Sequence, residues 1–411
     1  MPPDMGVPAA EQLRILASGA SATIPEDEFT ERLTRSVSAG VPLRVKLGID
    51  PSSPDIHLGH AVPLRKLRRF QEFGHTAVLI IGDFTGQVGD PSGQSAMRRA
   101  LTAGEVVENA ATYVDQARRI LLSDRLEVRH NSEWLGTMGV EGLLRLAAQA
   151  TVAQMLERDD FSKRYSEGRP ISIVEFLYPL LQAQDSVEIR SDVELGGTDQ
   201  NFNLLVGRDL QGRAGQEPQI VFTLPLLEGL DGVQKMSKSL GNYVGIAEPP
   251  EEMFGKLMRV PDHLIGKYLR LATDLDPAEI PSLEAEAAVG GPGAGHAKRR
   301  LAGEVVTLYH DAAAAERAEQ HFDRLHKEHE LPDEIEQAAI PTDAVKDGRV
   351  LMPKLLVAAG LARSTSQARD LIEQGGVKLE GKAVGELELP LEQVAGRVLQ
   401  VGKRGFRRLL A

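Results

Sequence analysis

The sequence predicts an α/β fold: a Rossmann-like parallel sheet with a helical insertion, followed by an α-helical domain and a small α+β domain. Residues 43–49 have the pattern of a short buried strand, and residues 77–81 form a continuous apolar run. Such a run is typical of a strand covered on both faces. A helix is expected between them, and strand, helix and strand within about 40 residues form a βαβ unit with parallel pairing.

The helix between these two strands is predicted to begin near Leu58 and to stop at Gly74. Its apolar residues Leu64, Leu67 and Phe70 recur at helical spacing, while the basic residues between them can face water. The 40 residues that open the chain have a polar, helical pattern. Further strand candidates are short apolar stretches at residues 126–129, 192–195 and 219–224.

The chain is expected to form three domains, because 411 residues are too many for one ordinary core. Residues 1–240 form the predicted nucleotide-binding, catalytic domain, whose helical insertion covers about 115–185. Residues 241–340 are acidic and helical, and residues 348–411 form a small basic unit.

Charge is distributed unevenly along the chain, whose net charge is -12. From residue 344 to the end there are 12 Lys and Arg against 7 Asp and Glu, whereas the remainder has 35 against 52. A small basic unit on an acidic body is typical of an RNA-contacting appendage. An ordinary solvated surface explains the same counts, so charge alone leaves both interpretations open.

Composition excludes several classes of site and location. The chain contains no Cys, which excludes disulfides, zinc–thiolate sites and a Cys nucleophile. No apolar run approaches the roughly 20 residues that span a bilayer. The N-terminal segment lacks the basic and apolar parts of a secretory signal. We therefore expect a cytoplasmic protein without a membrane partner.

The segment His57-Leu58-Gly59-His60 lies at the predicted helix start. Two His three positions apart can face the same way, and helix N-termini bind anions. Gly59 leaves room for a planar or phosphate group to approach the backbone. A chance HxxH on a helix is the alternative, and a metal pair is disfavoured because no third ligand is nearby.

The loop Lys235-Met236-Ser237-Lys238-Ser239 is followed by Leu240-Gly241-Asn242. Two Lys and two Ser in a Gly-flanked loop form a mobile phosphate clamp, because the Lys charge sits on a flexible stem. An exposed basic loop is the alternative. Both segments in one chain, on opposite halves of a predicted parallel sheet, favour a nucleotide site.

Tyr178, Gln182 and Asp185 lie at positions i, i+4 and i+7, so one helix face presents all three. Such a face can be a solvated stripe. The apolar neighbours in residues 176–181 instead favour a helix buried on most sides. A buried polar face needs hydrogen-bond partners, and a substrate can be one.

Five segments carry a resemblance to a known family: VKLGIDPSSPDIHLGH (45–60), GDFTGQVGDPSGQ (82–94), EFLYPLLQAQD (175–185), GGTDQNFN (196–203) and KMSKSLGN (235–242). The chain resembles the class I aminoacyl-tRNA synthetases, whose signatures are HxGH and KMSKS. More narrowly, it is similar to bacterial tyrosyl-tRNA synthetases over nearly its full length. The segment at 363–382 is similar to a small RNA-binding domain shared by a ribosomal protein and pseudouridine synthases.

The resemblance implies an ATP site. His57 and His60 would stabilise the ATP phosphates, and Lys235 and Lys238 would hold the leaving pyrophosphate. Arg98 matches a mobile basic residue of the family. The complete implied set for ATP is His57, Gly59, His60, Gly197, Asp199, Lys235, Ser237 and Lys238. From the residues alone, Asp199 is equally consistent with a helix N-cap.

The resemblance also implies a tyrosine site and an RNA surface. Asp185 would accept a hydrogen bond from the substrate phenol, while other polar residues would bind its ammonium and carboxylate. The implied tyrosine set is Asp50, Asp90, Tyr178, Gln182, Asp185 and Gln200, and the RNA set is Arg363, Ser364, Arg369 and Lys378. Asp90 is equally consistent with a turn cap in Asp-Pro-Ser-Gly.

Two residues depart from the family pattern. Many members have a Tyr at the position of Lys46, where it contacts the substrate phenol, so phenol recognition here rests more on Asp185. The mobile loop commonly has a Lys where this chain has Gln94, which weakens a pyrophosphate contact through that residue.

The implied activity is that of a tyrosine–tRNA ligase. Tyrosine and ATP would give tyrosyl-adenylate and pyrophosphate, and the tyrosine would then pass to the 3′ end of its tRNA. ATP with Mg2+ is the expected co-substrate, without a tightly bound metal, and a homodimer is expected through the helical insertion.

Three other interpretations stay open. A tryptophanyl enzyme shares the architecture, although the polar set on residues 178–185 speaks against it. A nucleotidyltransferase also carries HxGH, but the helical region and the RNA-binding segment would then have no purpose. A non-catalytic RNA-binding paralogue is expected to lose a catalytic His or Lys, and all four are present.

Overall fold

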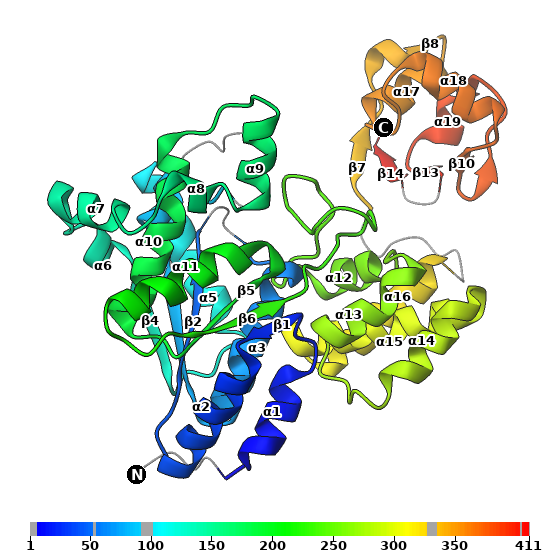
Figure 1. Cartoon of the computed structure of the whole chain (residues 1–411). Helices are drawn as coiled ribbons and strands as arrows, with labels where there is room; N and C mark the ends of the chain where they lie inside the picture. The colour runs from blue at the N-terminus through cyan, green and yellow to red at the C-terminus, as the bar shows by residue number, and fades with distance from the viewer. Residues whose placement is uncertain (1–5, 52–54, 92–101, 327–334, 403–404, 411) are drawn as a thin grey trace. The chain divides into compact units, whose positions relative to one another are not determined.

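The computed structural model describes residues 6–51, 55–91, 102–326, 335–402 and 405–410 (Figure 1). The chain forms two compact units, Met1–Glu319 and Gln320–Ala411. The first unit contains both the sheet and the helices that follow it. The boundary expected near residue 240 therefore stays a prediction.

The described part of the first unit is built on a six-stranded sheet in the order β1-β6-β5-β2-β3-β4. Its strands are β1 (Ala22–Ile24), β2 (Arg44–Ile49), β3 (Thr76–Ile81), β4 (Leu126–His130), β5 (Val193–Gly197) and β6 (Ile220–Leu224). The strands from β2 to β6 pair in parallel, as the βαβ pattern predicts. β1 pairs antiparallel to β6. The sequence pattern missed β1, because three residues are too few to show a strand periodicity.

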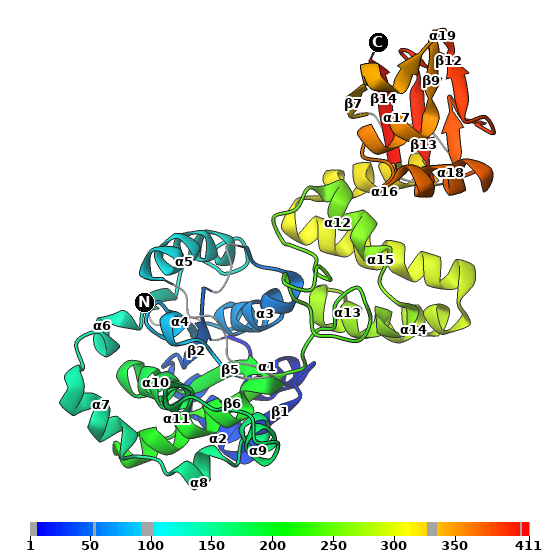
Figure 2. The same cartoon turned by 90° about the horizontal axis from the view of Figure 1, so that it is seen from above.

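Helices cover both faces of this sheet (Figures 1 and 2). On one face, Phe29 of α2 (Glu26–Ala39), Phe70 of α3 (Leu58–Glu72) and Phe222 of β6 form a cluster of edge-to-face rings. On the other face, Val78 and Ile80 of β3 pack against the long helix α10 (Ile173–Ile189) and its neighbour α11 (Asn201–Arg213). Alternate residues of β3 point to opposite faces, and the apolar run of this strand therefore fills both layers.

Between β4 and α10 the chain forms a series of short helices; the range of about 115–185 expected for the insertion also takes in β4 and most of α10, so its bounds stay a prediction. The short helices are α6 (Ser132–Leu135), α7 (Gly139–Ala147), α8 (Val152–Met155) and α9 (Asp159–Ser166). Elsewhere the first unit contains α1 (Ala9–Ala17), α4 (Thr85–Val88), α5 (Ala103–Ala117) and the 3-10 helices η1 (Thr198–Gln200) and η2 (Asp262–Leu264). The predicted helical region after the sheet comprises α12 (Pro250–Leu257), α13 (Ile265–Ala272), α14 (Ile280–Val289), α15 (Gly291–Tyr309) and α16 (Ala312–His326).

The second unit has the predicted α+β composition and a hydrophobic core of its own. Its larger sheet has the order β11-β10-β13-β14-β7, and its smaller sheet the order β12-β9-β8. The strands are β7 (Gln337–Ala339), β8 (Val345–Lys346), β9 (Arg349–Leu351), β10 (Val377–Leu379), β11 (Lys382–Ala383), β12 (Glu388–Pro390), β13 (Val398–Val401) and β14 (Gly405–Leu410). The helices are η3 (Thr342–Ala344), α17 (Met352–Ala358), α18 (Thr365–Glu373) and α19 (Leu391–Val394). β7 pairs with β14, so the folded unit begins before residue 348.

None of the helices in the described ranges combines the length and the apolar character that crossing a membrane requires.

The cluster of Phe29, Phe70 and Phe222 is expected to stabilise the first unit. We expect Phe70→Ala to lower the free energy of unfolding of the first unit by about 3–5 kcal/mol, because a fully buried ring leaves a cavity. Chemical denaturation followed by circular dichroism measures this change. The control Val233→Ala alters an exposed side chain and should cost less than about 0.5 kcal/mol. Equal effects of the two substitutions would contradict the assignment of the cluster as core.

Candidate active site

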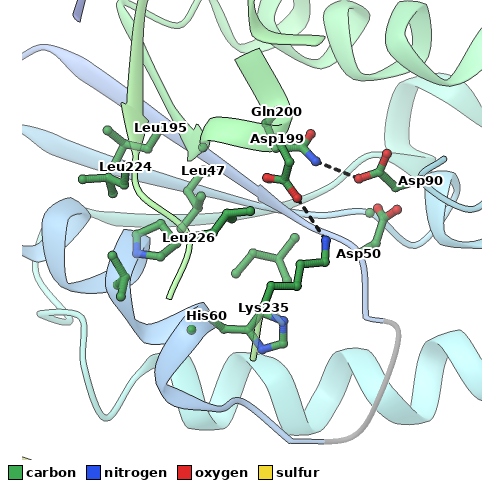
Figure 3. Close-up of a pocket in the computed structure, with 18 of the residues that line it drawn as sticks. Leu47, Asp50, His60, Asp90, Leu195, Asp199, Gln200, Leu224, Leu226 and Lys235 are labelled. Atoms are coloured by element: carbon green, nitrogen blue, oxygen red, sulfur yellow. Dashed lines mark hydrogen bonds and ion pairs between the residues drawn. The ribbon is translucent and has the colours of Figure 1, made fainter. Parts of the chain in front are cut away.

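A cavity of about 520 Å³ opens at the carboxyl ends of β2 and β5 (Figure 3). The strand order reverses there, because the chain continues from β2 to β3 on one side and from β5 to β6 on the other. Ligands of open α/β sheets bind in the crevice outside the strand ends at such a switch point. The cavity has the size of an ordinary small-molecule site, for which ~300–1,000 Å³ is usual.

Every described residue that the sequence predicted for the ATP or tyrosine site lines this cavity. They are Asp50, His57, Gly59, His60, Asp90, Tyr178, Gln182, Asp185, Gly197, Asp199, Gln200, Lys235, Ser237 and Lys238. Arg98 and Gln94 lie outside the described residues. The fold thus gathers residues that span 189 positions of sequence, from 50 to 238, around one space.

The HxGH segment forms the start of α3, with His57 at the N-cap. The rings of His57 and His60 stack with their centroids 3.8 Å apart. Gly59 leaves space for the His57 ring, because a Cβ at this position would stand 3.0 Å from it. Burial, helped by the nearby charges of His60 and the two loop lysines, lowers the pKa of His57 to about 2. His57 is therefore a neutral hydrogen-bond donor at pH 7 and not a cation.

Polar contacts with neighbouring segments hold the KMSKS loop in place. Lys235 Nζ lies 3.1 Å from Asp199 Oδ2 (Figure 3), and Lys238 forms an ion pair with Asp55. The loop backbone is fixed by Asn242, whose Oδ1 accepts a hydrogen bond from Ser237 N at 2.8 Å. Both lysines thus face the cavity with carboxylate partners that an anionic ligand can replace.

The GGTDQ segment turns from β5 into η1 at the cavity edge. A Cβ at Gly197 would lie 2.6 Å from the Asp199 carboxylate, so a larger residue would displace that side chain. Asp199 lies inside η1 and is not the N-cap of η1 or of α11, so the capping alternative is wrong. Gln200 Nε2 donates a 2.8 Å hydrogen bond to Asp90 Oδ2 (Figure 3). Asp90 is thereby tied to the β5 edge of the site.

The polar face of α10 is buried, so the solvated-stripe alternative is wrong. Tyr178 and Asp185 are 6% and 3% exposed. The Tyr178 hydroxyl donates to Asp50 Oδ2 at 2.8 Å, and Thr85 Oγ1 donates to the other oxygen of the same carboxylate at 2.7 Å. Burial and the neighbouring carboxylates raise the pKa of Tyr178 well above its usual value. Its hydroxyl is therefore protonated at neutral pH.

Asp185 lies at the far end of the same helix face and accepts two hydrogen bonds. Trp134 Nε1 donates to Oδ1 at 2.8 Å, and Asn131 Nδ2 donates to Oδ2 at 3.3 Å. Burial raises the pKa of Asp185 to about 7, although Lys46, Trp134 and Asn131 each lower it. The carboxyl therefore changes its protonation state near neutral pH.

Sequence reasoning missed four residues of this site: Gly82, Thr85, Asn131 and Trp134. A Cβ at Gly82 would lie 2.0 Å from the Asp50 carboxylate, so Gly82 makes room for that carboxylate. Asn131 directly follows β4, and residues at the carboxyl ends of parallel strands tend to reach ligand sites. That rule would have found Asn131, whereas no local signal marks Trp134.

Lys46 lies beneath the cavity. Its side chain is fully buried and forms a 2.9 Å ion pair with Glu194 of β5. The described residues contain no group of three or more acidic or His side chains that could hold a metal ion.

The predicted RNA residues lie in the second unit and are exposed: Arg363, Ser364, Arg369 and Lys378. Ser364 is the N-cap of α18, where its hydroxyl accepts a hydrogen bond from Gln367 N at 3.2 Å. Ser364 thus has a structural role in starting the helix that carries Arg369.

A sheet switch point flanked by HxGH and KMSKS defines the class I aminoacyl-tRNA synthetases, and comparison with known families agrees. The family model for tRNA synthetases class I (W and Y) matches residues 38–327, and the S4 domain model matches residues 353–392.

Individual relatives show which family within this class the chain belongs to. A tyrosine–tRNA ligase of Moorella thermoacetica is 51% identical over 97% of this chain and 96% of the relative. Those of Geobacter metallireducens and Thermotoga maritima are 51% and 50% identical over 98% and 97% of this chain, and 99% and 97% of their own lengths. The chain belongs to the tyrosine–tRNA ligase family.

Solved structures share the fold at lower identity. The tyrosyl-tRNA synthetase of Archaeoglobus fulgidus, complexed with L-tyrosine, superposes with a TM-score of 0.61 at 23% identity, over 75% of this chain and 99% of that one. A truncated mitochondrial tyrosyl-tRNA synthetase of Aspergillus nidulans gives 0.63 at 24% identity, over 77% and 94%.

Trp134 provides a direct probe of Asp185. It is the single Trp of the chain, so its fluorescence should titrate with a midpoint within about one pH unit of 7, as the carboxyl that it contacts takes up a proton. Asp185→Asn should abolish this transition. A transition that persists in the variant would belong to another group, and the raised pKa of Asp185 would be contradicted.

Proposed function

We propose that this chain activates L-tyrosine with ATP to give tyrosyl-adenylate and pyrophosphate, and then transfers the tyrosine to the 3′ end of its tRNA. One observation carries the proposal. A single cavity joins a stacked His pair at a helix start, two loop lysines and the buried polar face of α10. The names of the relatives at about 50% identity support the same reaction.

The phosphate end of ATP lies between the start of α3 and the KMSKS loop in this proposal. His57, His60 and the backbone at Gly59 donate hydrogen bonds to the phosphates, and the helix N-terminus favours their negative charge. Lys235 and Lys238 leave Asp199 and Asp55 and hold the pyrophosphate as it departs. Mg2+ enters with ATP, held mainly by phosphates and water.

The adenosine end lies along β5. The ribose meets Gly197, where no side chain obstructs its approach, and the carboxylate of Asp199, which Lys235 releases. Gln200 lies close to the reacting carboxylate of the amino acid. Arg98 remains a proposed mobile contact to the nucleotide.

The tyrosine lies over the face of α10. Its ammonium binds Tyr178, Gln182 and Asp90, with Asp50 nearby, and its phenol donates to Asp185. A substrate without the hydroxyl leaves the buried Asp185 without a partner for one oxygen lone pair, which is costly in a desolvated site. This cost selects tyrosine over phenylalanine.

The chemistry needs no strong protein base. The amino acid carboxylate attacks the α-phosphate of ATP, and the 2′-hydroxyl of the terminal tRNA adenosine then attacks the activated carbonyl. Positioning and charge stabilisation supply most of the rate enhancement in such transfers. A hydrogen bond donated by His57 to a phosphate oxygen suits this role.

The tRNA is bound partly by the second unit. Arg363, Ser364, Arg369 and Lys378 are exposed there, within or beside the match to the S4 domain model at residues 353–392. Basic side chains on a short helix and the following strand suit contact with an RNA backbone. A protein that charges tRNA works where translation occurs, so we propose a cytoplasmic location.

A homodimer forms through the helical insertion. Large apolar side chains are exposed on it: Val140, Leu144, Val152, Tyr165, Ile173 and Val174. They lie on α7, α8, α9 and the first turn of α10. Exposed apolar side chains concentrated on one part of a protein mark an interaction surface.

The reaction is tested by ATP–pyrophosphate exchange with tyrosine, phenylalanine and tryptophan in parallel. We expect exchange with tyrosine alone. Lys238→Ala should slow this exchange by about 100-fold or more, because a charge contact to the leaving group is lost. Its affinity for tyrosine, read from Trp134 fluorescence, should stay unchanged. Exchange with tryptophan would overturn the specificity, and no exchange from folded protein would leave only RNA binding.

The dimer is tested by light scattering after size-exclusion chromatography. Leu144→Arg places a charge among the exposed apolar side chains of the insertion and should give monomers at concentrations where the wild type is dimeric. Val233→Arg changes another exposed apolar residue, outside the insertion, and should leave the dimer intact. A dimeric Leu144→Arg variant would exclude this surface as the interface.

A further inference from the structure

A buried ion pair lies directly beneath the cavity. Lys46 of β2 and Glu194 of β5 are 0% and 1% exposed, and Lys46 Nζ lies 2.9 Å from Glu194 Oε1. The two residues are cross-strand partners in the central parallel pair of the sheet. Burying two charges costs more free energy than burying apolar residues of the same size, unless additional hydrogen bonds satisfy both.

The hydrogen bonds around this pair satisfy both charges. Lys46 Nζ also donates to Ser186 Oγ at 2.8 Å and to the backbone oxygen of Gln182 at 3.0 Å. Glu194 accepts from Ser186 Oγ at 3.0 Å, from Gln182 Nε2 at 3.2 Å and from Gln219 Nε2. Lys46 thus binds the backbone oxygen of Gln182, and Glu194 binds its side-chain NH2 group.

The polarity of these bonds fixes the orientation of the Gln182 amide. An ionised carboxylate only accepts hydrogen bonds, so Glu194 must face the NH2 group of Gln182 and not its oxygen. The oxygen of the same amide accepts from Asn203 Nδ2 at 3.2 Å and keeps a second lone pair. Gln182 lines the cavity, and an ammonium ligand requires an acceptor there.

A neutral group in place of Glu194 would not impose this orientation. A Gln at that position presents both a donor and an acceptor, so the Gln182 amide would lose its preference for one orientation. The acid therefore fixes the orientation, and Lys46 is the counter-charge that allows the acid to stay ionised when fully buried.

We propose that Glu194 and Lys46 are positioning residues for the substrate ammonium: together they hold the Gln182 amide with its oxygen available to a cation in the cavity. This inference rests on the proposed placement of the ammonium at Tyr178, Gln182 and Asp90. It assigns Lys46 to the ammonium end of the substrate.

The test compares two ligands in a charge-neutral variant. L-Tyrosine carries the ammonium, whereas 3-(4-hydroxyphenyl)propanoate keeps the phenol and carboxylate without it. For the double variant Lys46→Met with Glu194→Gln, we expect the Kd of tyrosine to rise by about tenfold or more, as for a lost hydrogen bond to a charged group. The Kd of the deamino ligand should change less than about threefold. Isothermal titration calorimetry measures both.

A matched control uses the same strand. Arg44 of β2 pairs with Glu127 at 2.7 Å, at the opposite end of β2 from the cavity. Arg44→Met with Glu127→Gln removes the same charges and should leave both Kd values unchanged. Glu194→Asp is the second test variant, since it keeps the charge but withdraws the acceptor from Gln182. Glu194→Asp should also raise the Kd of tyrosine without raising that of the deamino ligand. This variant tests the proposal if the double variant does not fold.

Each possible result of these titrations either supports or contradicts the proposal. Equal weakening of both ligands would overturn the proposal, because it indicates general damage to the pocket or an effect on the phenol end. Unchanged tyrosine binding would overturn it as well. If the wild-type protein binds the two ligands equally, the proposed ammonium placement fails, and if it binds no tyrosine, the proposed function itself fails.

Discussion

β2 and β5 pair in parallel through residues 45–47 and 193–195, at the point where the strand order of the sheet reverses. The rest of the first unit depends on this pairing. It opens the crevice in which the cavity forms, and it sets the end of β2 beside the end of β5. Asp50 and Gly197, which are 147 positions apart in the chain, thereby line one space.

The same pairing sets the electrostatics of the site. Lys46, Asp185 and Glu194 are buried between the sheet and α10, so each charge there needs a partner in the protein. Lys46 and Glu194 neutralise each other, whereas Asp185 has only neutral donors in Trp134 and Asn131. Burial raises the pKa of Asp185 to about 7, although the nearby charge of Lys46 and these two hydrogen bonds lower it. One buried layer thus holds a permanent ion pair and a carboxyl that titrates near neutrality.

On the other side of the cavity, the lysines form ion pairs that an anionic ligand can replace. Lys235 is 43% exposed and pairs with Asp199, and Lys238 pairs with the exposed Asp55. The other partner in each pair is 20% exposed, and such partly exposed pairs contribute little stability, about 0–1 kcal/mol, so a polyphosphate can replace them at low cost. The Asp185 end of the cavity is therefore buried, whereas the lysine ion pairs at the other end are partly exposed. An enzyme that must select one side chain and release pyrophosphate needs both properties.

Periodicity over short stretches predicted the parallel sheet and its five main strands, and local motifs together with the family resemblance predicted most of the polar residues that line the cavity, though not Thr85 or Asn131. The sequence by itself did not determine which donors face Asp185, that β1 completes the sheet, or that Lys46 pairs with Glu194. Trp134 and Asp185 are 51 positions apart, and Lys46 and Glu194 are 148 apart. Contacts of this kind depend on strand register and on how α10 packs against the sheet, and no local pattern carries that information. The orientation of the Gln182 amide likewise depends on the folded chain, since it follows from the polarity of hydrogen bonds to Glu194 and Asn203, which are distant from Gln182 in the sequence.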